Sequence, residues 1–270
     1  MQKLIFDVSL IGNERKIMRV TILGTGTSQG VPVIACKCDV CRSDDSKDKR
    51  LRSSIMVEEG NTRIVVDCGP DFRQQMLTHE VDNLDAILLT HEHADHIFGL
   101  DDIRSFNWLR KSPMDVYCEP RVQKNLRNIF NYVFAANKYP GTPQMDLFDL
   151  ENEEFKIGPA NITPIRVYHH QLPVYGFRFG RFAYLTDFNV IEEQELDKLF
   201  GVDTLVICAL RKTPHISHLN LTGALELIEK IGPRKAYLTH LSHEMGKHRE
   251  LLDELPSNVE PGYDGLVLEI

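Results

Sequence analysis

The sequence predicts an α/β protein in which two β-sheets pack against each other and helices cover their outer faces. Two observations favour this fold class. The first part of the chain reads mainly as strands, including a hairpin, whereas later parts alternate strands with helices. In addition, several apolar strands end in a histidine or an aspartate, as a site built along the rim of a sheet requires.

The first half of the chain supplies a hairpin and the first helices. Two apolar runs flank Glu59-Gly60-Asn61, and such a turn between strand-like segments predicts a β-hairpin. The elements expected here are strands over 19–24, 54–57 and 62–67, a helix over 70–78, a strand over 84–89, a helix over 97–110, a strand over 114–118 and a helix over 121–134.

The second half is predicted to be richer in strands. Leu221, Leu225 and Ile228 recur at helical spacing before the stop signal Gly232-Pro233, which predicts a helix. The expected elements are strands near 155–157, 162–168, 174–178, 182–185 and 203–209, a helix over 221–231, a strand over 236–239, a helix over 248–254 and a strand over 265–270. Residues 1–17 fit none of this pattern and read as an extension of unknown role, whereas 18–270 reads as one domain.

The composition indicates a globular protein of a reducing compartment. Of the 270 residues, 42% are hydrophobic and 26% are charged, and the net charge of −8 argues against a general nucleic-acid surface. The sequence contains no run of 18 apolar residues, and Met1–Lys16 lacks the pattern of a signal peptide. Six cysteines, three of them clustered, fit a metal site better than a disulfide framework. We therefore expect a cytoplasmic location and no membrane partner.

The most informative segment is Thr90-His91-Glu92-His93-Ala94-Asp95-His96. It places three histidines and one aspartate within six positions, between an apolar strand and the expected start of a helix at Ile97. His91 and His93 can point the same way from an extended segment, and Asp95 and His96 lie beyond the turn. Imidazole and carboxylate groups are good ligands for divalent metals, so this spacing favours a site for two metal ions.

This string, together with its preceding strand, resembles the metallo-β-lactamase superfamily of metal-dependent hydrolases, and the resemblance runs from about Met18 to Ile270. It implies a four-layer αββα sandwich and further donors at three strand ends. His169, Asp187 and His240 match that pattern, with His169 favoured over His170 because it directly continues its strand.

The resemblance also implies how the donors are shared. One metal would take His91, His93 and His169, the other would take Asp95, His96 and His240, and Asp187 would bridge both. Zinc or manganese would suit this site. Asp67, at the end of the strand over 62–67, would support the metal-binding loop through hydrogen bonds.

A second donor cluster lies in Cys36-Lys37-Cys38-Asp39-Val40-Cys41. Three thiols this close together favour a zinc ion, and a closed shell of three cysteines and one histidine would be structural. His243 is the best fourth ligand because it lies three residues after His240, and His79 and His248 are the rivals.

The cysteine cluster after Gly24-Thr25-Gly26-Thr27-Ser28 resembles one branch of the superfamily, the phosphoribosyl cyclic phosphodiesterase of the carbon–phosphorus lyase pathway. In that branch a histidine three residues after the last catalytic histidine completes the structural zinc site. The resemblance implies hydrolysis of a small, cyclic phosphodiester by a metal-bridging hydroxide. His218 would meet the leaving oxygen, with His215 as runner-up, and Asp95 would help to orient the nucleophile.

Other functions remain open within the superfamily. A tRNA 3′-processing endonuclease is disfavoured because the segment 138–154 is acidic, and a quinone-cofactor biosynthesis protein is disfavoured because the full set of metal donors is present. The expected partner is a small anionic phosphodiester rather than a nucleic acid. The sequence leaves the oligomeric state open, a homodimer included.

Overall fold

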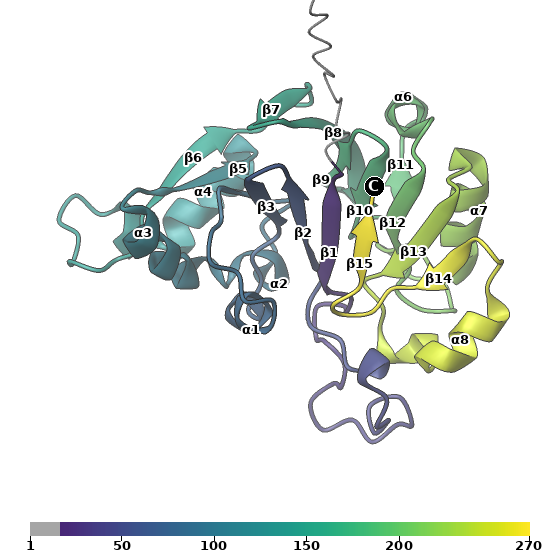
Figure 1. The fold of residues 1–270 in the computed structure, drawn as a ribbon. Helices are drawn as coiled ribbons and strands as arrows, with labels where there is room; N and C mark the ends of the chain where they lie inside the picture. The colour runs from purple at the N-terminus through teal and green to yellow at the C-terminus, as the bar shows by residue number, and fades with distance from the viewer. Residues whose placement is uncertain (1–16) are drawn as a thin grey trace, which may run out of the picture.

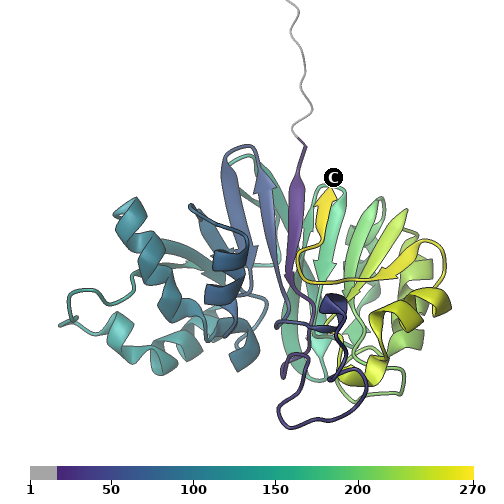
Figure 2. The same cartoon turned by 60° about the horizontal axis from the view of Figure 1, so that its bottom comes forward.

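The computed structural model describes residues 17–270, so all but the last residue of the expected N-terminal extension, 1–17, lie outside it. The expected α/β sandwich is confirmed: two sheets stack at the centre of the molecule, and helices flank them on both sides (Figure 1). Figure 2 shows the same layers after rotation, with helices outside each sheet.

The first sheet has seven strands and contains both ends of the described chain. Each neighbouring pair among β15, β1, β2 and β3 is antiparallel, whereas the neighbouring pairs from β3 to β6 are parallel. In spatial order the strands are β15 (Val267–Glu269), β1 (Arg19–Gly24), β2 (Ser54–Glu59), β3 (Thr62–Val66), β4 (Ala86–Leu88), β5 (Met114–Cys118) and β6 (Met145–Asp149).

The second sheet has eight strands and mixes hairpins with parallel pairs. Its β10, β12, β13 and β14 run parallel, and β8 and β9 form a long antiparallel pair. The order is β11 (Val190–Ile191), β8 (Ala160–His169), β9 (Leu172–Phe179), β10 (Phe182–Leu185), β12 (Thr204–Cys208), β13 (Lys235–Thr239) and β14 (Val259–Pro261), with β7 (Phe155–Ile157) paired to β8.

The helices divide between the two outer faces. On the first sheet lie α1 (Phe72–Thr78), α2 (Ala94–Ile97), the 3₁₀ helix η2 (Leu100–Ile103), α3 (Arg104–Arg110), α4 (Pro120–Ile129) and α5 (Asn131–Phe134), and on the second α6 (Glu193–Leu196), α7 (Leu221–Ile231) and α8 (His248–Glu254). Short 3₁₀ helices complete the set at Ser46–Asp48, Asp197–Leu199 and His243–Met245. Within residues 17–270, none of the helices combines the length and apolar character that a membrane crossing needs.

Three apolar clusters hold the four layers together. Successive residues of a strand point to opposite faces, so Ile64 and Val66 of β3 pack between the sheets while Val65 packs under the helices. The cluster between the sheets also contains the aromatic side chains Phe177 and Tyr184 of the second sheet. The core therefore follows directly from the apolar alternation of the strands.

One expected helix is broken into three. The prediction of a helix over 97–110 is wrong at its start, because α2 begins at Ala94 and therefore contains Asp95 and His96. The chain then passes Gly99 into η2 and α3. Gly99 packs against the chain after β3: a Cβ there would lie 2.1 Å from the carbonyl oxygen of Gly69. This contact interrupts the helix where two backbones touch.

Several short elements were not expected from the sequence. The acidic strand β6 pairs with β5 at the edge of the first sheet, and β14 extends the second sheet beside β13. The expected helix over 121–134 ends at Ile129 and resumes at Asn131, because Phe130 adopts a non-helical conformation with ψ of 45°. Pairing with a neighbouring strand forms β6 and β14, and a single kink divides the helix. The periodicity of apolar residues in the sequence shows neither of these.

A buried polar network anchors the loop between β1 and β2 to the C-terminal segment. The Asp264 carboxylate accepts hydrogen bonds from the Thr25 backbone N–H (2.9 Å), the Thr25 hydroxyl (2.7 Å) and the Leu51 N–H (2.6 Å). Arg50, which is buried, donates to the Thr25 hydroxyl and to the Gly262 carbonyl. The glycine-rich loop and the cysteine cluster are thereby held against the body of the protein.

Gly69→Ala should destabilise the fold, because its Cβ would lie 2.0 Å from the carbonyl oxygen of Asp95. We expect a loss of about 1–3 kcal/mol in the free energy of unfolding, as for overpacking, together with a lower metal content. Urea denaturation and elemental analysis measure both. Gly223→Ala in α7 is the control, because its nearest neighbours lie at 3.3 Å, and it should cost little.

Asp264→Asn tests the polar network through its pH dependence. Burial raises the pKa of Asp264 from 3.8 to about 6, against the opposing effect of its hydrogen bonds and Arg50. An acid whose pKa is raised by folding contributes stability below its unfolded pKa, and this contribution is lost as pH rises through the folded value. The variant should be less stable than wild type, since one donor loses its acceptor, and the deficit should narrow as the pH rises from about 4 to about 6. A deficit independent of pH in urea denaturation would contradict this assignment.

Candidate metal centre

The expected donors converge at one edge of the two sheets. His91 and His93 follow β4, Asp95 and His96 lie in α2, and His169 ends β8. Asp187 and His240 follow β10 and β13, two strands of the second sheet. Residues from both sheets thus meet at a single place. They can do so only because the two sheets are stacked.

Three of the aspartate and histidine residues at or near the site have a left-handed backbone conformation. Asp67, Asp187 and His240 have φ values of 66°, 52° and 55°, and each lies within two residues of the end of a strand. This conformation is uncommon outside glycine and costs conformational energy, although Asp and His tolerate it better than most residues. Such strain at three converging strand ends points to a function beyond folding.

Asp187 lies at the centre of the donors. One carboxylate oxygen is 3.3 Å from His96 Nε2 and 4.0 Å from His91 Nε2, while the other is 2.9 Å from His240 Nδ1. The rings of His93 and His169 lie 5.2 Å apart, next to His91. The donor atoms of His91, His96 and Asp187 all lie within 4.8 Å of one another. Asp187 therefore stands between two groups of donors, as a bridging ligand would.

Asp67 supports this cluster through its contacts with Thr90 and His96. It is fully buried and accepts hydrogen bonds from the Thr90 N–H (2.9 Å) and hydroxyl, and it lies 2.6 Å from His96 Nδ1. This contact turns His96 Nε2 toward Asp95 and Asp187, at 3.1 and 3.3 Å. Nevertheless, His96 Nε2 is buried without a hydrogen-bond partner. A nitrogen facing two carboxylates in this way has the geometry of a metal ligand.

The electrostatics of the cluster favour a bound cation. Burial and the nearby His96 hold the pKa of His91 well below its ordinary value. Burial opposes the charge on Asp187, yet His240 and His96 hold the pKa of that carboxyl well below its usual range. Burial would lower the pKa of His96, but Asp95, Asp187 and Asp67 raise it well above normal. Ionised carboxylates buried among imidazoles form a donor set that suits zinc or manganese.

His218 lies beside these donors. Its ring centroid is 4.3 Å from that of His169 and 4.9 Å from that of His240. Burial and His240 lower the pKa of His218 to about 3, and its Nδ1 is buried without a hydrogen-bond partner. The side chain also lies within ligand distance of Asp187 and His240, so a metal-binding role competes with the expected proton-donor role.

The two alternative histidines lie further from the centre. His215 is 5.1 Å from the His218 ring, and its Nδ1 accepts a hydrogen bond from the Ser217 N–H. At His170 the backbone takes a left-handed turn and its N–H donates to Asn189, whereas the preceding His169 reaches the other rings.

The cysteine cluster closes around His243. Its Nδ1 lies 3.2, 3.4 and 3.5 Å from the sulfur atoms of Cys36, Cys38 and Cys41. The Cys41 N–H lowers the pKa of Cys38 to about 6, whereas burial raises the pKa of Cys41 to about 11. Three sulfurs and one imidazole nitrogen converging on one point fit a tetrahedral zinc site.

The rival fourth ligands point elsewhere. The His248 ring packs edge-on against Tyr263 at 5.7 Å, and its backbone N–H donates to the buried Asp48. His79 lies beside Gly265 instead. Neither ring belongs to the group of donors around the three cysteines.

Glu92 has a supporting role that sequence reasoning missed. It lies between His91 and His93 but pairs with Arg121 and accepts from Asn125 (3.1 Å), both on α4. Arg121 in turn donates to the Pro173 carbonyl at 2.7 Å. Alternation along the extended segment could have revealed this, since His91 and His93 face one side and Glu92 the other.

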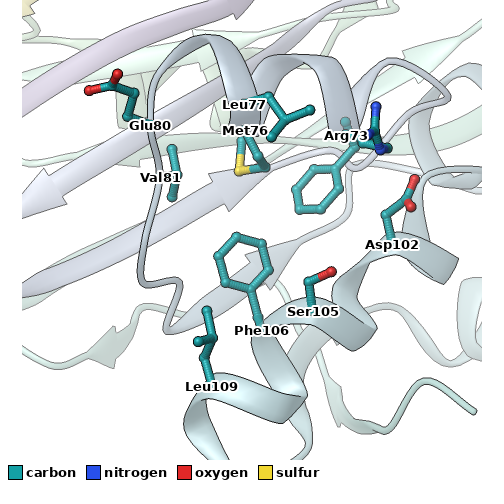
Figure 3. Close-up of a pocket in the computed structure, with 10 residues that line it drawn as sticks. Arg73, Met76, Leu77, Glu80, Val81, Asp102, Ser105, Phe106 and Leu109 are labelled. Atoms are coloured by element: carbon teal, nitrogen blue, oxygen red, sulfur yellow. The ribbon is translucent and has the colours of Figure 1, made fainter. Parts of the chain in front are cut away.

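Among the hollows on the described part of the chain, two differ clearly in character. An apolar groove of about 440 Å³ runs between α1 and α3, where Phe106, Met76 and Leu109 face one another (Figure 3). A polar pocket of about 330 Å³ is lined by His218 and Thr27, and the Thr27 hydroxyl lies 3.3 Å from His240 Nε2. Only the polar pocket adjoins the histidine cluster, so it is the one relevant to the chemistry.

A family comparison agrees with this geometry. The profile described as a beta-lactamase superfamily domain matches residues 62–241, two thirds of the chain. The chain belongs to the metallo-β-lactamase superfamily. The matched residues include every donor of the histidine cluster.

Relatives within the superfamily refine the comparison. A crystal structure described as a new diphosphatase from the PhnP family has a TM-score of 0.89 and 37% identity, and the match covers 94% of this chain and 97% of that one. Zinc-bound PqqB from Methylobacterium extorquens shares the fold, with a TM-score of 0.73 and 20% identity over 93% of this chain and all of that one. The expected resemblance to the cyclic phosphodiesterase branch is in keeping with the first neighbour.

A curated octanoyltransferase of Porphyromonas gingivalis is 43% identical over 252 residues. The match covers 92% of this chain but 51% of that protein. The chain thus spans about half of this relative's length, and the name describes the whole of it. For this chain, the fold and the PhnP-family neighbour support the chemistry of a metal-dependent hydrolase.

Cys38→Ser should release the zinc expected at the cysteine cluster, because a hydroxyl is a much weaker zinc ligand than a thiolate. We expect the variant to lose one zinc per chain and to unfold at a lower temperature, while folded protein keeps its histidine-site metals. Elemental analysis and thermal unfolding measure this. Cys208→Ser, at a buried cysteine outside the cluster, is the control for the loss of a thiol. Purified wild-type protein that contains no tightly held zinc would contradict the assignment.

Proposed function

We propose that the protein is a phosphodiesterase with two catalytic metal ions that hydrolyses small cyclic phosphodiesters. The observation that carries this proposal is the position of Asp187 between two groups of histidine and aspartate donors. A bridging carboxylate with donors on both sides is what a two-metal site needs to hold its ions close together. The neighbouring PhnP-family diphosphatase, which covers nearly the whole chain, supports a phosphorus-based substrate.

The seven donors divide into two sets in this proposal. His91, His93 and His169 would hold one metal, Asp95, His96 and His240 would hold the other, and Asp187 would contribute to both. When bound, two divalent cations supply a nucleophilic water at neutral pH and neutralise charge on the phosphate oxygens. Asp67 and Thr90 hold His96 in place through the hydrogen bonds described above.

His218 acts on the leaving group. It lines the polar pocket and lies beside His169 and His240, so it faces the position of a phosphate held by the donors. An imidazole there can donate an N–H hydrogen bond to the departing oxygen. In its protonated form, which a nearby phosphate anion favours, it would pass a proton to that oxygen as the bond breaks and be left as neutral imidazole. Asp95, which contacts His96, combines ligation with orientation of the attacking water.

The alternative functions are less well supported. The segment 138–154, which contains β6, carries five acidic residues and one lysine, so it does not provide a basic arm for tRNA. A non-catalytic cofactor-biosynthesis protein would not need the complete donor set. The transferase name belongs to a relative about twice as long, and the similarity to half of that protein does not assign the activity to this chain.

Asp187→Ala and His218→Ala separate binding from proton transfer. Asp187→Ala removes the shared donor, so it should abolish metal binding at the histidine cluster together with activity. His218→Ala should retain both metals and lower kcat by roughly 10²–10⁴-fold, the usual range for a positioned acid or base. Metal content by elemental analysis and turnover of a diester with a poor leaving group are the measurements. Loss of one metal in His218→Ala would instead make His218 a ligand.

The substrate class can be tested by comparing esters. We expect the metal-loaded protein to hydrolyse bis-p-nitrophenyl phosphate faster than p-nitrophenyl phosphate, with cyclic phosphates of ribose or nucleosides among the best substrates. A diester leaves one esterified oxygen to depart toward His218, whereas a monoester dianion binds metals as a product does. Efficient trimming of precursor tRNA without hydrolysis of 2′,3′-cyclic nucleotides would sink this proposal, as would preferential hydrolysis of nitrocefin.

A further inference from the structure

Three histidines of one proposed metal site come from different sheets. The loop after β4 of the first sheet carries His91 and His93, whereas His169 is the last residue of β8 in the second sheet. Since β4 and β8 do not belong to the same sheet, strand pairing does not set the spacing between these side chains. Contacts between the loop and the second sheet must set it instead.

One guanidinium bridges the two elements. Arg121, in the first turn of α4, donates through Nη1 to Glu92 of the loop and through Nη2 to the Pro173 carbonyl of β9, at 2.7 Å for the second. Pro173 pairs across the hairpin with Tyr168, the residue before His169. The arginine therefore reaches from the metal-binding loop of one sheet to the strand end of the other.

Further contacts hold Arg121 in place. Its Nη2 lies 3.2 Å from one carboxylate oxygen of Glu119, and the other oxygen lies 2.7 Å from Arg166 of β8. The Arg166 guanidinium lies 3.8 Å above the centre of the Tyr175 ring, and the Tyr175 N–H donates to the Thr90 carbonyl at 3.1 Å. These contacts form a closed circuit from α4 through β8 and β9 back to the loop.

The energetics of the circuit favour a role in geometry. The side chains of Arg121, Glu92 and Glu119 are 32%, 17% and 14% exposed, and ion pairs that reach solvent contribute little to stability. A planar guanidinium with two nitrogens on two different elements nevertheless fixes the direction between them. Metal affinity depends on such support, because it orients the histidine ligands.

We propose that Arg121 is a positioning residue that sets the spacing between His93 and His169, and thereby the affinity of the metal ion that they share. This inference rests on the proposed function, since it uses the division of the donors into two sets. The other metal ion should be insensitive to Arg121, because Asp67 holds its ligand His96 through a separate contact.

Substitutions in the bridge test this role. Arg121→Met should weaken the shared ion by about 10–100-fold, the usual range when a group that supports a ligand is lost. Arg121→Lys should also weaken it, because one ammonium group does not replace two nitrogens that point to different partners. Glu92→Gln should keep most of the affinity, since its amide oxygen still accepts from Nη1, whereas Glu92→Ala should lose it. Calorimetric titration with Mn²⁺, which prefers imidazole and carboxylate to thiolate, measures both affinities of the histidine cluster.

Ligand deletions identify the ion that responds. In His240→Ala, Arg121→Met should weaken the ion that remains, whereas in His93→Ala it should leave the remaining ion unchanged. Either background decides between the two ions. The matched control is Arg127→Met, which removes the same charge from the same helix, where Arg127 lies 4.7 Å from the centre of the Phe134 ring. Its Mn²⁺ affinities should equal those of wild type.

Three results would overturn the inference: equal weakening of both ions by Arg121→Met, an equal effect of Arg127→Met, or unchanged affinities in both Arg121→Met and Glu92→Ala. A merely structural role would weaken both ions and lower the melting temperature of the metal-free protein. The expected pattern without hydrolysis of bis-p-nitrophenyl phosphate would support the role of Arg121 and remove the phosphodiesterase assignment. Diester hydrolysis with unchanged affinities in the variants would do the opposite, and a wild type that binds a single Mn²⁺ at the histidines would remove both.

Discussion

The hydrogen bonds of Asp67 are the constraint on which the site depends. This buried carboxylate receives the N–H and hydroxyl of Thr90 and contacts His96, so it joins the end of β3 to the loop after β4 and to α2. The adjoining Cys68 and Gly69 pack directly against α2: Cys68 N–H donates to the His96 carbonyl, and Gly99 N–H donates to the Cys68 carbonyl. The metal-binding loop is thus held by backbone contacts that leave no room for a Cβ.

The same cluster is costly for folding and useful for chemistry. Buried carboxylates and imidazoles, together with left-handed turns at Asp67, Asp187 and His240, raise the free energy of the folded state when no cation balances them. Divalent ions would offset this cost, so metal binding and stability are linked. The three apolar clusters of the sandwich supply the rigid frame that tolerates the strain.

One short segment connects three parts of the proposed mechanism. Within five residues after β13, His240 joins the histidine cluster, Ser242 and Glu244 line the polar pocket, and His243 joins the cysteines. A zinc ion at the cysteines would therefore fix the wall of the pocket as well as the loop that bears it. The loop between β1 and β2, which carries the three cysteines, is also held by the network of Asp264 and Arg50. These buried hydrogen bonds help to fix the position of this polar loop.

The sequence by itself determined the layered fold class, most strands, helices α7 and α8 and the identity of the candidate donors, because apolar alternation, helix stops and closely spaced histidines are local patterns. The tertiary structure decided what depends on distant neighbours. It broke the helix expected over 97–110, where Gly99 meets Gly69, and it made an acidic segment into β6 beside β5. It also brought Arg211 to Glu244 and placed Asp187 between donors of both sheets. Such contacts join residues far apart in the chain, so only the stacking of the two sheets could specify them.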